Sequence, residues 1–375
     1  MALNRRNFLA GLSLLAASSA LRKGFEFEDF HSLKALYKDD FLFGNIITGK
    51  QLEKSSGPEL ELLEREFNAL TMENDMKWQL VHPAPEVWHF DPVNRFMDFC
   101  DRHGHQAIGH VLVWHSQTPS WVFETEQGKP IGRQQLLDRM KGHIQTLAGH
   151  CKGRLYAWDV VNEAIEDNGT FRKSAWYQQI GADFIAEAFR TAHEADPSAQ
   201  LLYNDYNMHI PAKRRAVVAL IRSLKAQGIP IHGVGMQGHI GLDYPDLNEF
   251  EKSIKAFANE GVKIHISEID IDVLPNPYRS AEISTRLNYA PWKDPYREGL
   301  PPAVSDEQAD RGEALFKVLL NHKESIERVS FWGLADGMSW KNNFPIRGRV
   351  NYPLLWGRNF EEKEILRRLR ALKSQ

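Results

Sequence analysis

The chain has 375 residues, of which 42% are hydrophobic and 25% are charged, as in an ordinary globular protein with a large core. Its formal net charge of -3 provides no basic surface, which argues against nucleic acid or an anionic membrane as a partner. Two cysteines, Cys100 and Cys151, are too few for a disulfide scaffold, and they lack the CxxC spacing typical of zinc sites.

The first twenty residues have the pattern of an export signal. Arg5 and Arg6 precede a short apolar run at residues 8–17, and small residues follow at 18–20. The paired arginines, followed by Phe-Leu, resemble a twin-arginine signal. An uncleaved membrane anchor and a chance amphipathic helix are the alternatives, although the run is too short to span a bilayer. We therefore expect residues 1–20 to be a signal peptide, and a soluble, monomeric mature protein in the periplasm or the medium.

Short apolar segments separated by helical patterns make up the remainder of the chain. They predict eight strands, at residues 41–47, 69–73, 107–114, 156–162, 201–205, 233–239, 263–270 and 329–334. Strands that alternate with helices predict an α/β fold, specifically a closed (β/α)8 TIM barrel. An open doubly wound sheet is the alternative, but no GxGxxG motif follows the first strand, so a dinucleotide site is not indicated.

Between the strands, apolar residues recur at three- and four-residue steps over 184–192, 217–224 and 247–257, which predicts helices. No linker, low-complexity tract or repeat divides the chain, so we predict one catalytic domain over residues 33–372. The least regular stretch, 274–302, is rich in proline and follows the seventh strand. Its aromatic residues either pack the loop itself or line a groove, and they are Tyr278, Tyr289, Trp292 and Tyr296.

In a TIM barrel the active residues lie at the carboxyl ends of the strands, and side chains alternate along each strand. In the seventh strand Ile264 and Ile266 share parity with Glu268 and Asp270. We therefore expect the two isoleucines to fill the barrel interior and the two acids to emerge at its mouth.

The sixth and third strands have the same kind of pattern. Gly233 and Gly235 share parity with Gln237 and His239, so small residues lie below polar ones. The third strand places together His110, Leu112 and Trp114. Polar strand ends that converge on one face indicate an active site.

Two glutamates, Glu163 and Glu268, each end an apolar strand, the fourth and the seventh. Hydrolysis of a glycosidic bond requires one carboxylic acid to protonate the leaving oxygen and one carboxylate to attack or to activate water. Either glutamate alone would more often be a surface residue. As a pair on opposite sides of a barrel mouth, they predict a glycoside hydrolase.

Seven motifs in barrel order then make the chain recognisable. The sequence resembles family 10 of the glycoside hydrolases, the endo-1,4-β-xylanases, over nearly the whole mature chain. The matching segments are 73–78 (ENDMKW), 109–117 (GHVLVWHSQ), 158–164 (WDVVNEA), 203–207 (YNDYN), 235–239 (GMQGH), 267–270 (SEID) and 331–334 (FWGL).

The resemblance implies a role for each matching residue. Glu163 would be the general acid/base and Glu268 the nucleophile. Asn162 would hold the sugar 2-hydroxyl, and His239, held by Asp270, would bond the nucleophile. The implied substrate-binding residues are Glu73, Asn74, Lys77, His110, Trp114, Gln117, Tyr206, Gln237, Trp332 and Trp340, with Asn207 beside Tyr206. For the three tryptophans, core packing is the alternative.

These observations predict an endo-acting, retaining hydrolase that cleaves internal β-1,4-xylosidic linkages of xylan by double displacement. Polysaccharide is the expected partner, and neither a metal nor another cofactor is expected. The same mechanism on cellulose or mixed-linkage glucan is the closer alternative, because one hydroxymethyl group separates these substrates. A non-catalytic barrel that only binds polysaccharide is the more distant one.

Overall fold

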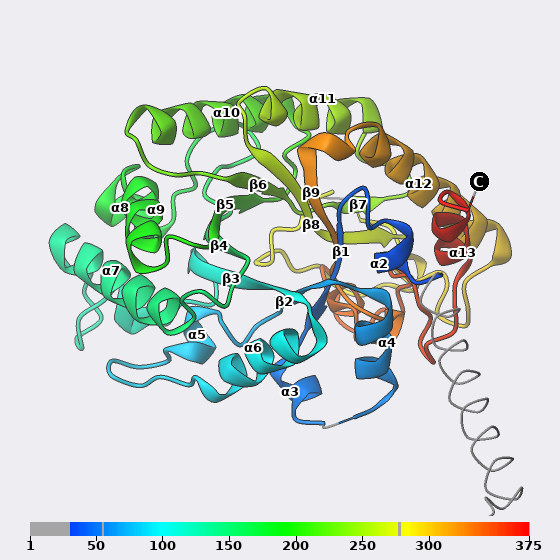
Figure 1. The fold of residues 1–375 in the computed structure, drawn as a ribbon, viewed down its shortest axis with the longest axis horizontal. Helices are drawn as coiled ribbons and strands as arrows, with labels where there is room; N and C mark the ends of the chain where they lie inside the picture. Colours follow the sequence, from blue (N-terminus) through cyan, green and yellow to red (C-terminus); the bar gives the residue numbers. More distant parts are fainter. Residues whose placement is uncertain (1–30, 55, 277–278, 375) are drawn as a thin grey trace, which may run out of the picture.

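The computed structural model describes residues 31–54, 56–276 and 279–374. These residues form a closed barrel of parallel strands surrounded by helices (Figure 1). The fold is therefore the (β/α)8 TIM barrel predicted from the sequence. The expected signal peptide at residues 1–20, and Tyr278 of the proline-rich stretch, lie outside the described residues.

Each strand pairs in parallel with its neighbours in the order β6-β5-β4-β3-β2-β1-β9-β8-β7, and pairing of β6 with β8 closes the ring. The strands are β1 (Leu42–Ile47), β2 (Ala69–Met72), β3 (Gln106–Trp114), β4 (Ala157–Asn162), β5 (Gln200–Asp205), β6 (Gly233–Met236), β7 (His239–Gly241), β8 (Lys263–Asp272) and β9 (Ile326–Phe331). The predicted sixth strand is divided into β6 and β7 because Gly238, at φ 86°, leaves the extended conformation.

Helices connect most successive strands and cover the outside of the barrel, whereas residues 237–238 alone join β6 to β7 (Figure 1). The α-helices are α2 (Leu33–Leu36), α3 (Gly49–Leu52), α4 (Pro58–Glu66), α5 (Trp78–Val81), α6 (Asp91–His103), α7 (Arg133–His150), α8 (Ala175–Ile180), α9 (Phe184–Ala195), α10 (Pro211–Ala226), α11 (Leu247–Ala258), α12 (Pro302–Asn321) and α13 (Glu364–Ala371). The 3-10 helices are η1 (Ser120–Val122), η2 (Pro291–Lys293), η3 (Lys323–Ser325), η4 (Asp336–Met338) and η5 (Trp340–Asn342).

The ends of these helices follow local sequence signals. Helix α6 has proline in its first turn and ends at Gly104, whose φ of 70° is the left-handed conformation that glycine adopts readily. The side chain of Asp246 caps α11 by accepting a hydrogen bond from the amide of Asn248 at 2.9 Å. Helices α9, α10 and α11 confirm the three amphipathic patterns that predicted them.

The main apolar core lies between the strands and the surrounding helices, and it corrects one prediction. Ile264 and Ile266 of β8 belong to this outer core, together with helix residues such as Phe257. They do not fill the barrel interior. Leu112 of β3 also belongs to the outer core, so it does not share the cleft with His110 and Trp114.

The barrel interior beneath the site is instead largely polar. Arg328 of β9 donates to Thr71 of β2 at 3.1 Å, which crosses the barrel because β1 lies between these two strands. Its Nε lies 3.4 Å from Nδ1 of His265. Ser267 donates to Asn204 of β5 at 2.6 Å, again across an intervening strand. His265 and Ser267 are therefore the inward-facing residues of β8.

An irregularity in β8 explains why the parity argument failed there. The register of β8 against β9 shifts between Ile266 and Ile269, as at a β-bulge. The bulge allows Glu268 to face the cleft although Ser267, its neighbour, faces inward. The predicted alternation of side chains is correct in β6. A Cβ atom added to Gly235 would point into the barrel and lie only 2.1 Å from Oδ1 of Asn204, so a small residue is needed there.

In the long loop between β8 and α12, residues 273–301, the described residues pack along the rim of the barrel. The amide of Leu287 donates to Pro345 at 2.9 Å, and Arg349 donates to the carbonyl of Pro275 at 3.0 Å. Both cysteines are buried and unbonded. Among the described helices, none is long and apolar enough to cross a membrane.

Candidate active site

A cleft opens where the strands end, at the carboxyl face of the barrel. Most of the predicted site residues line it. These are Glu73, Asn74, Lys77, His110, Trp114, Gln117, Asn162, Glu163, Gln237, His239, Glu268, Trp332 and Trp340. Asp270 and Tyr206 do not line the cleft; each lies behind a residue or loop that does.

Glu163 follows β4 and is 4% exposed. Its Oε2 accepts from the indole of Trp114 at 2.8 Å, and its Oε1 accepts from Gln237 at 3.0 Å. The backbone of Glu163 has a φ of 57°, a left-handed conformation that is uncommon for a residue with a side chain. Contacts on several sides must hold Glu163 in this conformation.

Glu268 is 5% exposed and faces the same cleft. Its Oε1 accepts from Asn204 at 2.7 Å, and its Oε2 lies 3.1 Å from Nε2 of His239. Burial alone would raise the pKa of Glu268. The hydrogen bond and positive charge of His239, with smaller contributions from His110 and Asn204, instead hold the pKa below its usual value.

Amide side chains join the two glutamates. Oδ1 of Asn162 accepts from Gln237 at 3.2 Å and from Asn204 at 3.1 Å, and these donors also bond Glu163 and Glu268 respectively. Asn204 belongs to the 203–207 motif, but no role for it was predicted from the sequence. Side chains two residues apart on a strand point to the same side, and Leu202 of β5 faces the barrel interior. This alternation could have predicted that Asn204 also points inward.

His239 connects the nucleophile candidate to a buried acid, as predicted. Its Nδ1 lies 2.8 Å from Oδ2 of Asp270, and the same oxygen accepts from the indole of Trp340 at 2.8 Å. Burial opposes the charged imidazolium, but Asp270 and Glu268 outweigh it and raise the pKa of His239 to about 9. His239 is therefore a cation beside Glu268 at neutral pH.

A buried lysine, Lys77, links several of the side chains that line the cleft. Lys77 donates to Asn74 at 2.9 Å and to Gln117 at 3.1 Å, and its ammonium lies 5.0 Å from the centre of the Trp114 ring. Burial lowers the pKa of Lys77, and nearby carboxylates oppose that shift. Burial raises the pKa of Glu73, which Lys77 partly offsets. This group presents amide, ammonium and aromatic surface to the cleft.

Two further acids, Asp159 and Asp205, position neighbouring side chains. Oδ2 of Asp159 lies 2.8 Å from Nδ1 of His110, and the His110 ring meets Trp332 edge-on with centroids 5.3 Å apart. Asp205 pairs with buried Lys213 at 2.7 Å. Burial raises the pKa of Asp205 to about 6 despite that partner.

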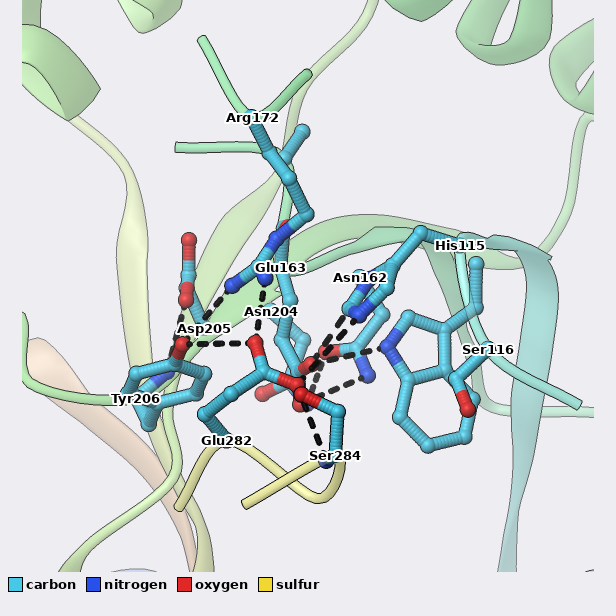
Figure 2. A network of polar contacts seen from close by, with 12 residues as sticks. His115, Ser116, Asn162, Glu163, Arg172, Asn204, Asp205, Tyr206, Glu282 and Ser284 are labelled. Carbon is cyan, nitrogen blue, oxygen red and sulfur yellow. Dashed lines mark hydrogen bonds and ion pairs between the residues drawn. The ribbon is translucent and has the colours of Figure 1, made fainter. Parts of the chain in front are cut away.

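The structure also adds residues that the sequence did not indicate. Ala281 and Ile283 of the 273–301 loop line the cleft, so this loop forms part of its wall. Figure 2 shows Glu282, from the same loop, facing Arg172 beside Glu163. No local pattern marks these residues, because the segments meet only through the tertiary fold.

The arrangement suits acid–base and nucleophilic chemistry on a sugar. Two buried carboxylates share one cleft, but they have different partners: indole and amide at Glu163, and imidazolium at Glu268. Different surroundings are how enzymes assign different tasks to two carboxyl groups. In the described part of the chain, no group of three or more His, Cys, Asp or Glu residues is placed to hold a metal ion.

Comparisons with known proteins agree with this geometry. An endo-1,4-beta-xylanase A from Xylanibacter ruminicola is 40% identical over 96% of this chain and 97% of its own length. A GH10 endoxylanase from a sugarcane soil metagenome has a solved structure with a TM-score of 0.89 and 49% identity, covering 91% of this chain and 100% of that one. A mutant structure in complex with xylotriose has a TM-score of 0.81 and 33% identity, covering 90% and 99%.

A sequence profile places the chain among these relatives. The profile described as Glycosyl hydrolase family 10 matches residues 32–372, which include every residue that lines the cleft. The chain therefore belongs to glycosyl hydrolase family 10.

Proposed function

We propose that the protein is an endo-1,4-β-xylanase that cleaves internal linkages of xylan with retention of anomeric configuration. Membership of family 10 and the xylanase names of its relatives support the activity and the substrate. The observation that carries the chemistry is the pair of buried carboxylates, Glu163 and Glu268, in one cleft. A retaining hydrolase needs two such groups, one acidic and one nucleophilic.

Glu268 is assigned as the nucleophile. Its pKa is held below the usual value, so it is ionised when substrate arrives. Asn204 and His239 each bond one of its oxygens, which directs the carboxylate while leaving it able to attack the anomeric carbon. The result is a covalent glycosyl-enzyme.

Glu163 is assigned as the general acid and base. In the first step it gives its proton to the leaving oxygen, and in the second step it takes a proton from the attacking water. Trp114 and Gln237 bond its two oxygens, and these bonds hold the carboxyl group in place between the steps. Asn162 is bonded to the same network and is assigned to the sugar 2-hydroxyl.

The remaining cleft residues are assigned to sugar binding. Glu73, Asn74, Lys77, His110, Trp114 and Gln117 would hold sugars on the non-reducing side of the cut, beneath Trp332 and Trp340. Gln237 would complete the site near the scissile bond. Tyr206, which lies behind the cleft wall, is assigned to the sugar beyond that bond. Pyranose rings stack on flat aromatic faces, and the polar groups around Lys77 match sugar hydroxyls. That a solved relative binds xylotriose supports this assignment.

Substrate and stereochemistry are tested together. We expect release of reducing sugar from xylan and arabinoxylan to be much faster than from carboxymethylcellulose, and the first product detected by proton NMR to be the β-anomer. Faster cleavage of carboxymethylcellulose would identify a glucan hydrolase, and an initial α-anomer would show inversion. A protein that releases no sugar from any of these polymers would be a non-catalytic binding barrel.

We further propose that residues 1–20 direct export, by the twin-arginine route, and that the mature enzyme is a monomer with one catalytic domain over 33–372. A polymeric substrate outside the cell requires an exported enzyme, and the paired arginines at Arg5 and Arg6 match this route. Expressed in a bacterial host, the secreted protein should begin shortly after residue 20 by N-terminal sequencing. Retention of export after Arg5 and Arg6 are both replaced by lysine would contradict the twin-arginine assignment.

A further inference from the structure

Arg172, in the segment between β4 and α8, joins three separate parts of the rim (Figure 2). Its Nε donates to the backbone carbonyl of Glu163 at 2.7 Å. One terminal nitrogen donates to the hydroxyl of Tyr206 at 2.7 Å, and the other donates to the carboxylate of Glu282. The Arg172 side chain is 11% exposed, so water competes only weakly for these bonds.

The contact with Glu163 acts on the backbone that aims the acid/base. Glu163 has the left-handed φ of 57°, which the surrounding structure must maintain. Arg172 holds the Glu163 carbonyl, and Tyr203 accepts from the next amide, of Ala164, at 3.1 Å. The Glu163 amide itself donates to the carbonyl of Asn204 at 2.9 Å. Of these partners, Arg172 is the one that reaches out to another loop.

Glu282 supplies the other half of the contact from the 273–301 loop. Besides Arg172, its carboxylate accepts from Tyr206 at 3.4 Å and from the amide of Ser284 at 3.1 Å. Its neighbours Ala281 and Ile283 line the cleft. The position of this wall therefore depends on the ion pair.

The ion pair is stable over a wide pH range. Contact with His115 and the charge of Arg172, opposed by partial burial, hold the pKa of Glu282 well below its usual range. Glu282 consequently stays ionised at neutral and mildly acidic pH, where Arg172 keeps its charged partner. An exposed ion pair would contribute little, but these two side chains are only 11% and 20% exposed.

We propose that Arg172 and Glu282 form a latch that positions Glu163 for proton transfer and fixes the wall of the cleft that Ala281 and Ile283 form. Arg172 and Glu282 are positioning residues, since they act through Glu163 and Tyr206. The inference rests on the proposed function, in which Glu163 is the general acid. It assigns a role in bond cleavage to the proline-rich loop.

A positioning role predicts a loss that depends on the leaving group. A misplaced acid slows cleavage only when the leaving oxygen needs a proton, and small misplacements are costly. For Arg172→Lys, which keeps the charge but loses the planar fork, we expect kcat/KM to fall by about 10-fold or more on phenyl xylobioside. On dinitrophenyl xylobioside the loss should be no more than about twofold.

The test compares Arg172→Lys and Glu282→Gln with the wild-type full chain on both aryl xylobiosides. Glu282→Gln keeps the shape of the side chain and removes the charge, so it reports on the latch even if the arginine variant folds poorly. Arg214→Met is the matched control, because Arg214 likewise bonds a carboxylate and a carbonyl of Glu249, between α10 and α11. The control should lose stability without any dependence on the leaving group.

Equal losses on the two substrates, or no loss in either latch variant, would overturn the proposal. Glu163→Ala in the same series separates the two levels of inference. If Glu163→Ala shows no dependence on the leaving group, the acid/base assignment itself is wrong. If it does and the latch variants do not, the assignment stands and only the latch is rejected.

Discussion

Replacing Glu268 by alanine is expected to abolish xylan hydrolysis, with kcat lower by at least about 10⁴-fold. The variant cannot form the covalent intermediate, and His239 is left without the carboxylate that it contacts at 3.1 Å. Rates on xylan and on aryl xylobiosides should fall together, because nucleophilic attack is required whatever the leaving group. Glu307→Ala, which removes an exposed carboxylate on α12, is the control and should retain full activity.

Azide provides a second measurement on the same variant. A small anion can enter the space that the Glu268 side chain leaves and attack the anomeric carbon from that face. With dinitrophenyl xylobioside, we expect azide to restore turnover and to give the α-azide, in which the configuration is inverted. Full activity of Glu268→Ala on xylan, or a β-azide product, would show that Glu268 is not the nucleophile.

The second large effect is expected for Glu163→Ala. Without its general acid the enzyme should lose between about 10²- and 10⁴-fold in kcat/KM on xylan. Dinitrophenyl xylobioside should be cleaved in the first step almost as fast as by the wild type, because its leaving group needs no proton. The second step also loses its base, so the covalent glycosyl-enzyme should accumulate.

Accumulation is measurable as a burst of dinitrophenol and as a mass increase of one xylobiosyl group on the protein. Azide should then attack the anomeric carbon of the glycosyl-enzyme from the β face and displace Glu268. The product is the β-azide, the opposite anomer from that given by Glu268→Ala. Glu163→Gln is the matched variant, since it preserves the side-chain shape between Trp114 and Gln237. Slow first-step cleavage of the activated substrate by both variants would contradict the assignment.

Strand positions were predictable because they depend on local periodicity. All eight predicted strands correspond to strands of the structure, and Glu163 and Glu268 enter the cleft from the predicted strand ends. The direction of side chains within β8 was predicted wrongly. The direction of these side chains depends on a register shift of β8 against β9. Such a shift is set by pairing between strands, and the spacing of Ile264 and Ile266 in the sequence does not indicate it.

Contacts between distant loops were not predictable from one sequence. Arg172 and Glu282 are 110 residues apart, and neither ends a strand or belongs to a recognisable motif. The proline-rich stretch 274–302 was interpreted either as packed by its own aromatic residues or as a groove wall. The structure supports the second interpretation through Ala281 and Ile283, which line the cleft.

The polar barrel interior has a consequence for recombination between relatives. Arg328 of β9 bonds Thr71 of β2 and lies against His265 of β8, so one buried guanidinium depends on partners from two other strands. In a chimera, replacing β9 alone by a strand without this arginine would leave Thr71 and His265 without their buried partner. Replacing a strand by one that carries a second cation would bury that cation without a counter-charge. Crossover points should therefore be chosen so that β2, β8 and β9 come from the same parent, together with β5, whose Asn204 bonds Ser267 of β8.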